Sequence, residues 1–263
     1  MDLGIKGRVA WVTGSSAGMG KATALSLARE GAKLALCSRS QANLETAARQ
    51  IRQATGVDPF VHVADVTDEK AVGGFAEAAE RKLGPPDILV NNAGGPPPGG
   101  FRDTPMEAWE AAHRLTLQSA ISFCRRVVPG MTQRGWGRIV TITSLTVKQP
   151  IETLLLSNTY RAGLTAFMKS LAGEVAPFGV TVNCICPGYT ATERLSELAE
   201  AQAKRRNITP VQVRQEWEKS IPAGRLGRPE EIADFIAFIA SDRAGYLTGA
   251  SILVDGGHIR ALV

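Results

Sequence analysis

The sequence has few cysteines and histidines and no long apolar run. Its four cysteines are spaced for neither a disulfide framework nor a zinc site: Cys37, Cys124, Cys184 and Cys186. No apolar stretch approaches the roughly 20 residues that a transmembrane helix needs. Residues 1–4 lack the basic and apolar regions of a signal peptide. We therefore expect a cytoplasmic protein with reduced thiols, no metal site and no membrane partner.

Strong charge of one sign is also missing. The 30 Lys and Arg residues exceed the 25 Asp and Glu residues by five, and these charges are spread along the chain. The one basic cluster, Lys204-Arg205-Arg206, falls in an expected helix. A nucleic-acid-binding protein usually carries a denser basic stripe. We expect no nucleic-acid partner, and assign the excess to a solvated helix face or to attraction for an anionic cofactor or substrate.

Apolar runs with strand character alternate with helical patterns along the whole chain. The expected strands are 9–12, 33–37, 60–64, 87–91, 138–142, 180–185 and 251–255. The helical patterns between them are 21–29, 41–54, 68–82, 105–128, 152–175 and 229–239. This alternation predicts an α/β fold, a single doubly wound parallel sheet of about seven strands with helices on both faces. Ligands bind such sheets at the carboxyl ends of the strands.

No linker divides the chain, so we expect one domain over residues 1–263. The polar helical segment 190–220 is an insertion that can act as a lid or can simply be a pair of surface helices. The loop Gly94–Gly100, with the sequence GGPPPGG, excludes both helix and strand. Both segments are expected to shape a substrate pocket.

A glycine-rich turn joins the first strand to the first helix. Glycines allow the backbone to approach a phosphate, and the free N–H groups of a helix N-terminus then face the anion. Because the turn has a strand before it and a helix after it, we interpret it as a dinucleotide site. The candidate cofactor-binding residues here are Gly14, Ser15, Ser16, Gly18, Met19 and Gly20.

The end of the second strand distinguishes between cofactors. An acidic residue there would bind the ribose hydroxyls of NAD, but the chain has Ser38-Arg39. An arginine can pair with a phosphate, so the sequence favours NADP(H) and leaves NAD(H) open; a solvated turn is the other interpretation of Arg39. After the third strand come Asp65 and Val66. Asp65 either bonds the adenine amine or caps the next helix.

Three motifs in order, Thr13-Gly14-x-x-x-Gly18-x-Gly20, Asn91-Asn92-Ala93-Gly94 and Pro187-Gly188-x-x-x-Thr192, resemble the short-chain dehydrogenase/reductase family. The resemblance covers the whole chain and implies a Rossmann-like domain that binds NAD(P). It implies that Asn91, Ala93 and Gly94 lie beside the cofactor, and that Pro187, Gly188 and Thr192 surround the nicotinamide and pyrophosphate. It also implies a homotetramer or homodimer built partly through helices 105–128 and 152–175.

The catalytic positions depart from that family. The family uses an asparagine, a serine, a tyrosine and a lysine. In register with these, the chain has Thr116, Ser144, Ser157 and Arg161. A serine is a far weaker acid than a phenol, and arginine stays protonated, so hydrogen-bond donors for a substrate oxygen remain while the obvious acid/base is lost. Arg161 can still hold ribose hydroxyls.

Other residues could replace the missing acid/base. Tyr160 lies three residues after Ser157, about 60° away around a helix. His113, Lys148 and Glu152 are further candidates, although each is equally consistent with packing or solvation.

The sequence therefore predicts an NAD(P)-dependent oxidoreductase that interconverts a carbonyl and a hydroxyl group on a small-molecule or acyl-type substrate. The alternative is a protein on the same fold that binds or senses NADP(H) without turnover.

Overall fold

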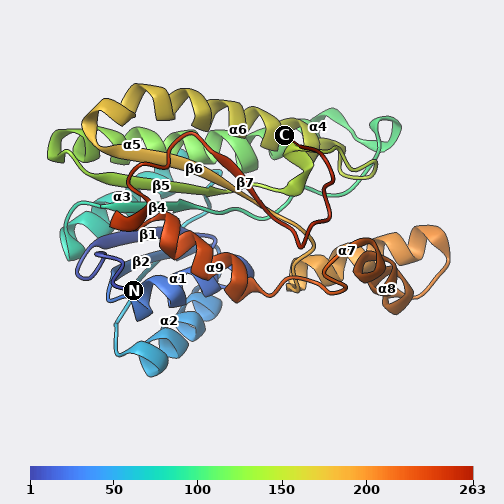
Figure 1. The fold of residues 1–263 in the computed structure, drawn as a ribbon, viewed down its shortest axis with the longest axis horizontal. Helices are drawn as coiled ribbons and strands as arrows, with labels where there is room; N and C mark the ends of the chain where they lie inside the picture. The colour runs from blue at the N-terminus through green and yellow to red at the C-terminus, as the bar shows by residue number, and fades with distance from the viewer. Residues whose placement is uncertain (263) are drawn as a thin grey trace.

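Residues 1–262 are described by a computed structural model, and within them seven parallel strands form one sheet in the order β3-β2-β1-β4-β5-β6-β7 (Figure 1). The strands are β1 (Val9–Thr13), β2 (Lys33–Ser38), β3 (Phe60–Val63), β4 (Ile88–Asn91), β5 (Gly137–Ile142), β6 (Val180–Pro187) and β7 (Ser251–Val254). The predicted doubly wound sheet is confirmed. The strand order reverses between β1 and β4, so the carboxyl ends of these two strands flank a crevice of the kind in which such sheets bind ligands.

Helices cover both faces of the sheet (Figure 1). One face carries α1 (Gly18–Arg29), α2 (Gln41–Thr55) and α9 (Pro229–Ile239); the other carries α3 (Glu69–Leu83), α5 (Ser119–Arg134) and α6 (Leu155–Val175). Because both faces are covered, the central strands are apolar almost throughout, as in other parallel sheets. Among residues 1–262, no helix combines the length and apolar character that crossing a bilayer requires.

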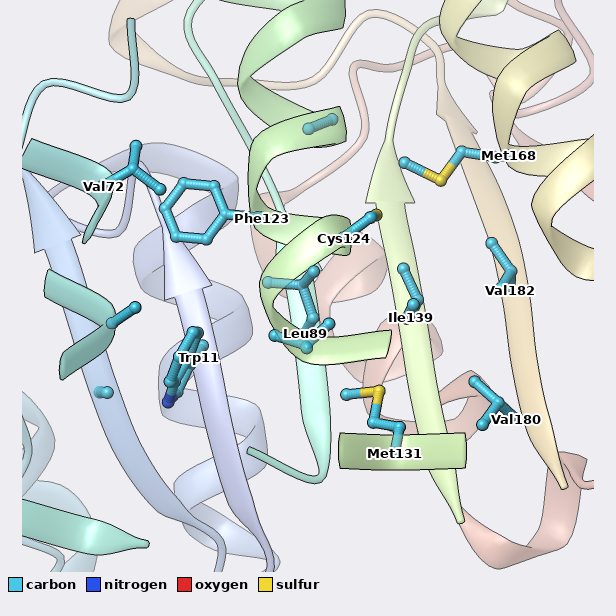
Figure 2. Close-up of a cluster of buried hydrophobic side chains, with 14 of the residues drawn as sticks. Trp11, Val72, Leu89, Phe123, Cys124, Met131, Ile139, Met168, Val180 and Val182 are labelled. Atoms are coloured by element: carbon cyan, nitrogen blue, oxygen red, sulfur yellow. The ribbon is translucent and has the colours of Figure 1, made fainter. Parts of the chain in front are cut away.

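Aromatic side chains fasten α3 and α5 to the sheet (Figure 2). The Trp11 ring of β1 meets Phe75 of α3 edge-on, with ring centroids 5.3 Å apart, and Phe75 meets Phe123 of α5 at 5.9 Å. All three side chains are essentially buried. Burying a side chain of this size stabilises the fold by about 1.5–3 kcal/mol. This packing fixes α5 against the strands whose carboxyl ends flank the crevice.

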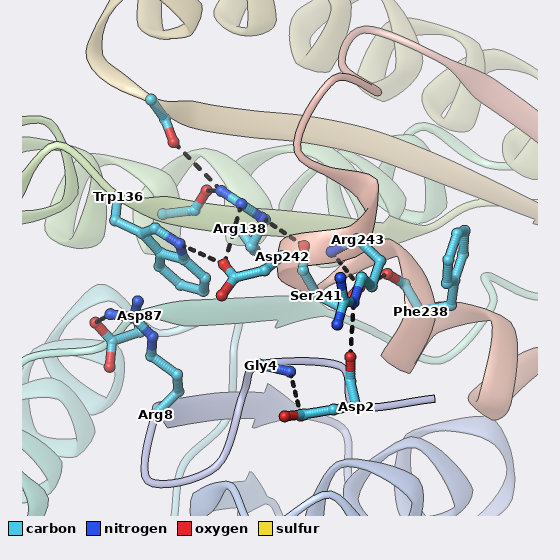
Figure 3. A network of polar contacts seen from close by, with 12 residues as sticks. Asp2, Gly4, Arg8, Asp87, Trp136, Arg138, Phe238, Ser241, Asp242 and Arg243 are labelled. Atoms are coloured by element: carbon cyan, nitrogen blue, oxygen red, sulfur yellow. Dashed lines mark hydrogen bonds and ion pairs between the residues drawn. The ribbon is translucent and has the colours of Figure 1, made fainter.

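A polar network closes the amino end of the sheet, opposite the site (Figure 3). The guanidinium carbons of Arg8 and Arg138 lie 3.8 and 4.3 Å from the centroid of the Trp136 ring. The indole nitrogen of Trp136 donates to Asp242 at 2.9 Å, and Nε of Arg138 donates to the carbonyl oxygen of Ser241 at 3.1 Å. Burial lowers the pKa of Arg138, while Asp242 opposes that shift. The network connects the segment that follows α9 to the start of β5.

Three expected helices differ from the structure by more than one residue. The helix expected over 21–29 begins at Gly18, so the last residues expected in the glycine turn already belong to α1. The pattern over 105–128 forms α4 (Met106–His113), a π-helical turn (Arg114–Gln118) and then α5. A π turn inserts extra backbone into a helix, and here it carries Thr116 inward, where it is buried. The helix expected from residue 152 begins at Leu155, because the side chain of Asn158 bonds both backbone groups of Ile151 and holds that segment as a turn.

Segment 190–220 contains two helices, α7 (Glu193–Arg206) and α8 (Pro210–Ser220). They project beyond the carboxyl end of the sheet (Figure 1). Their contact is a separate small hydrophobic cluster that includes Leu195, Val213 and Trp217. The Thr192 side chain accepts a hydrogen bond from the Leu195 N–H and caps α7, so this helix starts at the rim of the sheet.

Candidate active site

A cleft of about 480 Å³ opens at the carboxyl ends of the central strands. Its wall combines the turn after β1, the segment after β4, the start of α6, the end of β6 and the start of α7. Most of the residues that the sequence assigns to the cofactor line it: Gly14, Gly18, Met19, Arg39, Ala93, Gly94, Arg161, Pro187, Gly188 and Thr192.

The turn after β1 depends on glycine for its shape. Gly14 and Gly18 have φ values of +57° and +53°, a backbone conformation that residues other than glycine rarely adopt. A Cβ at Gly20 would lie 2.3 Å from the carbonyl oxygen of Gly14. Gly20 therefore lets α1 pack onto the turn and does not itself line the cleft. Asn92 holds the turn from the other side, since its Nδ2 donates to the carbonyl oxygen of Gly14 at 3.0 Å.

The N-terminus of α1 fits a dinucleotide phosphate. Its N-cap residue, Ala17, provides no side-chain cap, and no acidic residue lies in the first turn. The first backbone N–H groups of a helix need partners, and here Ala17, Gly18 and Met19 all line the cleft. Arg39 lines the same cleft and forms no ion pair with any residue of the described chain. No carboxylate stands at the end of β2 to repel a further phosphate.

Several other predicted cofactor residues do not line this cleft, namely Ser15, Ser16, Gly20, Ser38, Asp65, Val66 and Asn91. Ser15 is fully buried, and its hydroxyl donates to the carbonyl oxygen of Cys37 at 3.3 Å. Asp65 accepts from the backbone N–H and hydroxyl of Thr67, at 2.9 and 2.8 Å. It shapes the turn before α3, and Asp68 is the residue that caps that helix.

Ser144, Ser157 and Arg161 converge on the cleft from two elements. Ser144 follows β5, and its Oγ accepts a hydrogen bond from the Thr146 N–H at 3.2 Å. Ser157 and Arg161 lie one turn apart at the start of α6, both largely buried. Nη1 of Arg161 donates to the carbonyl oxygens of Ile142 and Thr143, each at 3.0 Å.

The guanidinium group of Arg161 is buried but charged. Burial lowers its pKa to about 10, and the nearby charge of Arg194 acts in the same direction. The guanidinium therefore stays protonated at neutral pH. It offers a fixed positive charge at the base of the cleft but cannot accept a proton there.

A second, small cavity of about 20 Å³ lies behind Arg161, which lines both spaces. The Thr116 hydroxyl and the Asn91 Oδ1 are buried there without a hydrogen-bond partner, while Asn91 Nδ2 donates to Thr141 at 3.3 Å. A space of this size holds one water molecule when polar groups surround it. Thr116 and Asn91 thus lie next to the cleft, behind its base.

The alternative acid/base residues lie elsewhere. Tyr160 packs on α4, with its ring centroid 6.1 Å from that of Trp109 and 5.7 Å from that of His113. Tyr160 and His113 thus face each other between α4 and α6, and neither lines the cleft. Lys148 and Glu152 also lie outside its lining.

The sequence did not single out Arg194, at the rim. Its Nη2 donates to the carbonyl oxygen of Pro96 at 2.7 Å, and its Nη1 pairs with Glu197 at 3.1 Å. These bonds connect α7 to the loop after β4 across the cleft. The only sequence signal was its place at the start of the segment expected to shape the pocket.

Known proteins resemble this chain over almost its whole length. Residues 14–258 match a family described as enoyl-(acyl carrier protein) reductase. The acetoacetyl-CoA reductase of Shinella zoogloeoides is 38% identical over 252 residues, covering 95% of this chain and 98% of the relative. The 3-oxoacyl-[acyl-carrier-protein] reductase FabG of Pseudomonas aeruginosa is 36% identical over 255 residues, covering 97% and 98%.

A solved structure is equally similar. The L-sorbose reductase of Gluconobacter frateurii, complexed with NADPH and L-sorbose, superposes with a TM-score of 0.94 at 35% identity, covering 100% of both chains. A short-chain type dehydrogenase/reductase from Mycobacterium marinum superposes with a TM-score of 0.88 at 30% identity, covering 99% of this chain and 98% of that one. With the glycine turn, the sheet order and the cleft in place, these matches show that the chain belongs to the short-chain dehydrogenase/reductase family.

Proposed function

We propose that this protein is an NADP(H)-dependent oxidoreductase that interconverts a carbonyl and a hydroxyl group. The observation that carries the proposal is that one cleft contains both halves of such a site. The start of α1, which has no side-chain cap, and Arg39, which has no ion-pair partner among residues 1–262, fit a phosphorylated dinucleotide. Ser144, Ser157 and Arg161 line the same space. The relatives named as reductases support the same reaction class.

The chain's own residues hold and polarise the substrate. Bound NADPH would supply the hydride. Ser144 and Ser157 donate hydrogen bonds to the substrate oxygen, and the charge of Arg161 stabilises the negative charge that develops on that oxygen. Since neither serine nor arginine is a good proton donor at neutral pH, the proton reaches the oxygen from solvent.

We also propose that the catalytic centre is divergent, with Ser157 and Arg161 in place of a tyrosine and a lysine. This departure favours a second candidate function, a protein that binds or senses NADP(H) without turnover. The two differ in one measurable property, which is turnover once the cofactor is bound.

The test is NADPH oxidation across ketone, sugar and 3-oxoacyl substrates by the wild type and by Ser144→Ala, with NADPH affinity measured beside it. We expect turnover by the wild type and a loss of at least about tenfold in kcat for the variant, with NADPH affinity unchanged. Cofactor binding without turnover on any substrate would favour the sensing role. Turnover that is unaffected by Ser144→Ala would remove that residue from the reacting centre.

We further propose a lid, an assembly and a location for this enzyme. The α7–α8 segment serves as a lid on a single domain, and Arg194 is its contact with the opposite rim. The protein assembles as a homotetramer or homodimer through α4, α5 and α6, and functions in the cytoplasm, where its four free cysteines stay reduced. Light scattering coupled to gel filtration measures the assembly.

A further inference from the structure

A second hollow, of about 240 Å³, adjoins the cleft on its substrate side. We call it the side pocket; its wall includes Ile151, Leu154, Leu198 and Trp217, with Lys204 and Arg205 also lining it. Leu154 and Leu198 line both the side pocket and the main cleft. A molecule whose carbonyl lies at Ser144 and Ser157 can therefore extend past these two leucines into the side pocket.

The aromatic side chains that form the apolar wall of the side pocket already pack against one another without a ligand. The rings of Tyr189 and Trp217 stack with centroids 4.9 Å apart and an interplanar angle of 11°, and His258 meets Tyr189 edge-on at 5.2 Å. Burial raises the pKa of Tyr189, so its phenol stays neutral. A rigid aromatic surface of this kind binds an apolar chain or ring with little loss of conformational entropy.

The charge along the side pocket is of one sign. Within residues 1–262, Lys204 and Arg205 form no ion pair, whereas the next residue, Arg206, is paired with Glu216 at 2.9 Å. No carboxylate belongs to the described lining of the side pocket. Two cations without an ion-pair partner among residues 1–262, beside an apolar surface, favour a ligand that carries both an apolar body and an anionic group.

Helix α7 sets the distance between the apolar wall of the side pocket and its two cations. Leu198 and Arg205 are seven residues apart on α7, which corresponds to about 10 Å along the helix. We infer that the substrate is an amphiphilic anion, in which the reacting carbonyl is followed by an apolar segment and, about 10 Å beyond the leucines, by an anionic group held by Lys204 and Arg205. This inference rests on the proposed function for the position of the carbonyl, but the side pocket itself does not.

The anion can be a free carboxylate or the phosphates of a carrier thioester, and two matched pairs of substrates distinguish them. The first pair is a straight-chain oxo acid and its uncharged methyl ester. The second pair is acetoacetyl-CoA and the acetoacetyl thioester of N-acetylcysteamine, which lacks the phosphates. Each is assayed with NADPH on the wild type, on Lys204→Ala/Arg205→Ala, and on Arg81→Ala/Lys82→Ala, which loses the same charge from an exposed pair at the end of α3.

We expect Lys204→Ala/Arg205→Ala to raise KM about tenfold for the anionic member of one pair, with the uncharged member and the control variant within twofold of wild type. The pair that responds identifies the carboxylate or the phosphates as the anion. Equal losses on charged and uncharged members, equal losses in the control variant, or no change at all would overturn the inference.

A binding measurement separates this inference from the proposed function. Decanoate and decanol, which share an apolar chain, are titrated against tryptophan fluorescence, with Trp217→Phe to confirm that the signal comes from the side pocket. Even without turnover on any substrate, a Kd for decanoate that rises about tenfold in Lys204→Ala/Arg205→Ala, with decanol unchanged, supports the side pocket. Equal responses to the two ligands, or no binding of decanoate, would contradict it.

Discussion

Arg161 donates a hydrogen bond of 3.0 Å to the main-chain carbonyl oxygen of Thr143, the residue directly before Ser144. A second bond from the same nitrogen reaches the carbonyl oxygen of Ile142. Arg161 thus connects the first turns of α6, which carry Ser157, to the end of β5 and to the residue directly before Ser144. The buried Arg161 therefore fixes the position of Ser157 relative to Ser144.

We expect Arg161→Met to lower the free energy of unfolding by about 2–4 kcal/mol, because two buried carbonyl oxygens lose their partner. Arg161→Lys keeps a charged donor and should lose less. Urea denaturation of both variants measures the difference. If the methionine variant were as stable as the wild type, the hydrogen bonds from Arg161 to the end of β5 would contribute nothing to the free energy of unfolding.

Arg39 sets the cofactor preference in this account. We expect Arg39→Ala to weaken NADPH binding about tenfold and to leave NADH binding nearly unchanged, because only NADPH carries the additional phosphate. Nicotinamide fluorescence titration measures both constants. Arg49→Ala, on the exposed side of α2, is the matched control and should alter neither. A parallel loss of affinity for both cofactors would argue against a phosphate contact.

The small cavity behind Arg161 predicts an ordered water molecule between Thr116 Oγ1 and Asn91 Oδ1 in a high-resolution crystal structure. Because the Thr116 hydroxyl has no protein partner, Thr116→Val should change the free energy of unfolding by less than about 1 kcal/mol. Thr141→Val removes the oxygen acceptor of Asn91 Nδ2 and leaves only the weak acceptor Cys124 Sγ, at 3.7 Å, so it should lower the free energy of unfolding by about 1–2 kcal/mol. Equal effects of the two changes in denaturation experiments would contradict this assignment.

The buried thiols predict a decline in stability at alkaline pH. Burial raises the pKa of Cys37, Cys124 and Cys184 from 9.0 to about 12. Between pH 9 and 12 these thiols ionise only in the unfolded state, so the unfolded state binds fewer protons and stability falls as pH rises. Each contributes a slope of about 1.4 kcal/mol per pH unit within that window.

Denaturation at several pH values measures this decline, and Cys37→Ala and Cys124→Ala should each make it shallower. Arg161 acts in the opposite direction between pH 10 and its unfolded pKa, since its folded pKa is lowered to about 10. The three thiols outweigh this single group. Stability that stayed constant from pH 9 to pH 11 would contradict the prediction.

The order of strands and helices followed from the sequence because alternating apolar runs and amphipathic patterns are local signals. The π-helical turn at Thr116 did not, because its backbone hydrogen bonds differ from those of an α-helix while its apolar spacing does not. The glycine turn was located correctly between β1 and α1, but α1 begins at Gly18 and includes the last three residues that the sequence assigned to the turn. Which of its residues face the cleft depended on tertiary contacts, such as those that bury Ser15 beneath β2.

The residues predicted to be catalytic differ in the same way between what local sequence shows and what depends on packing. The resemblance to the family motif placed Ser144, Ser157 and Arg161 at one site, and the structure brings all three to one cleft. The contacts of Tyr160 with Trp109 and His113 depend on how α4 and α6 pack, which no local pattern encodes. Arg194 was missed for a similar reason, since its partner Pro96 is 98 residues away.

The most direct test of the central claim follows the hydride itself. NADPH labelled with deuterium at the reactive nicotinamide carbon is incubated with ketone substrates, and the alcohol product is examined by mass spectrometry. We predict that deuterium appears on the carbinol carbon with the wild type, and that Ser157→Ala slows its appearance while NADPH affinity is unchanged. Tight binding of NADPH that depends on Arg39, with no deuterium in any product, would contradict an oxidoreductase and leave a protein that only binds its cofactor.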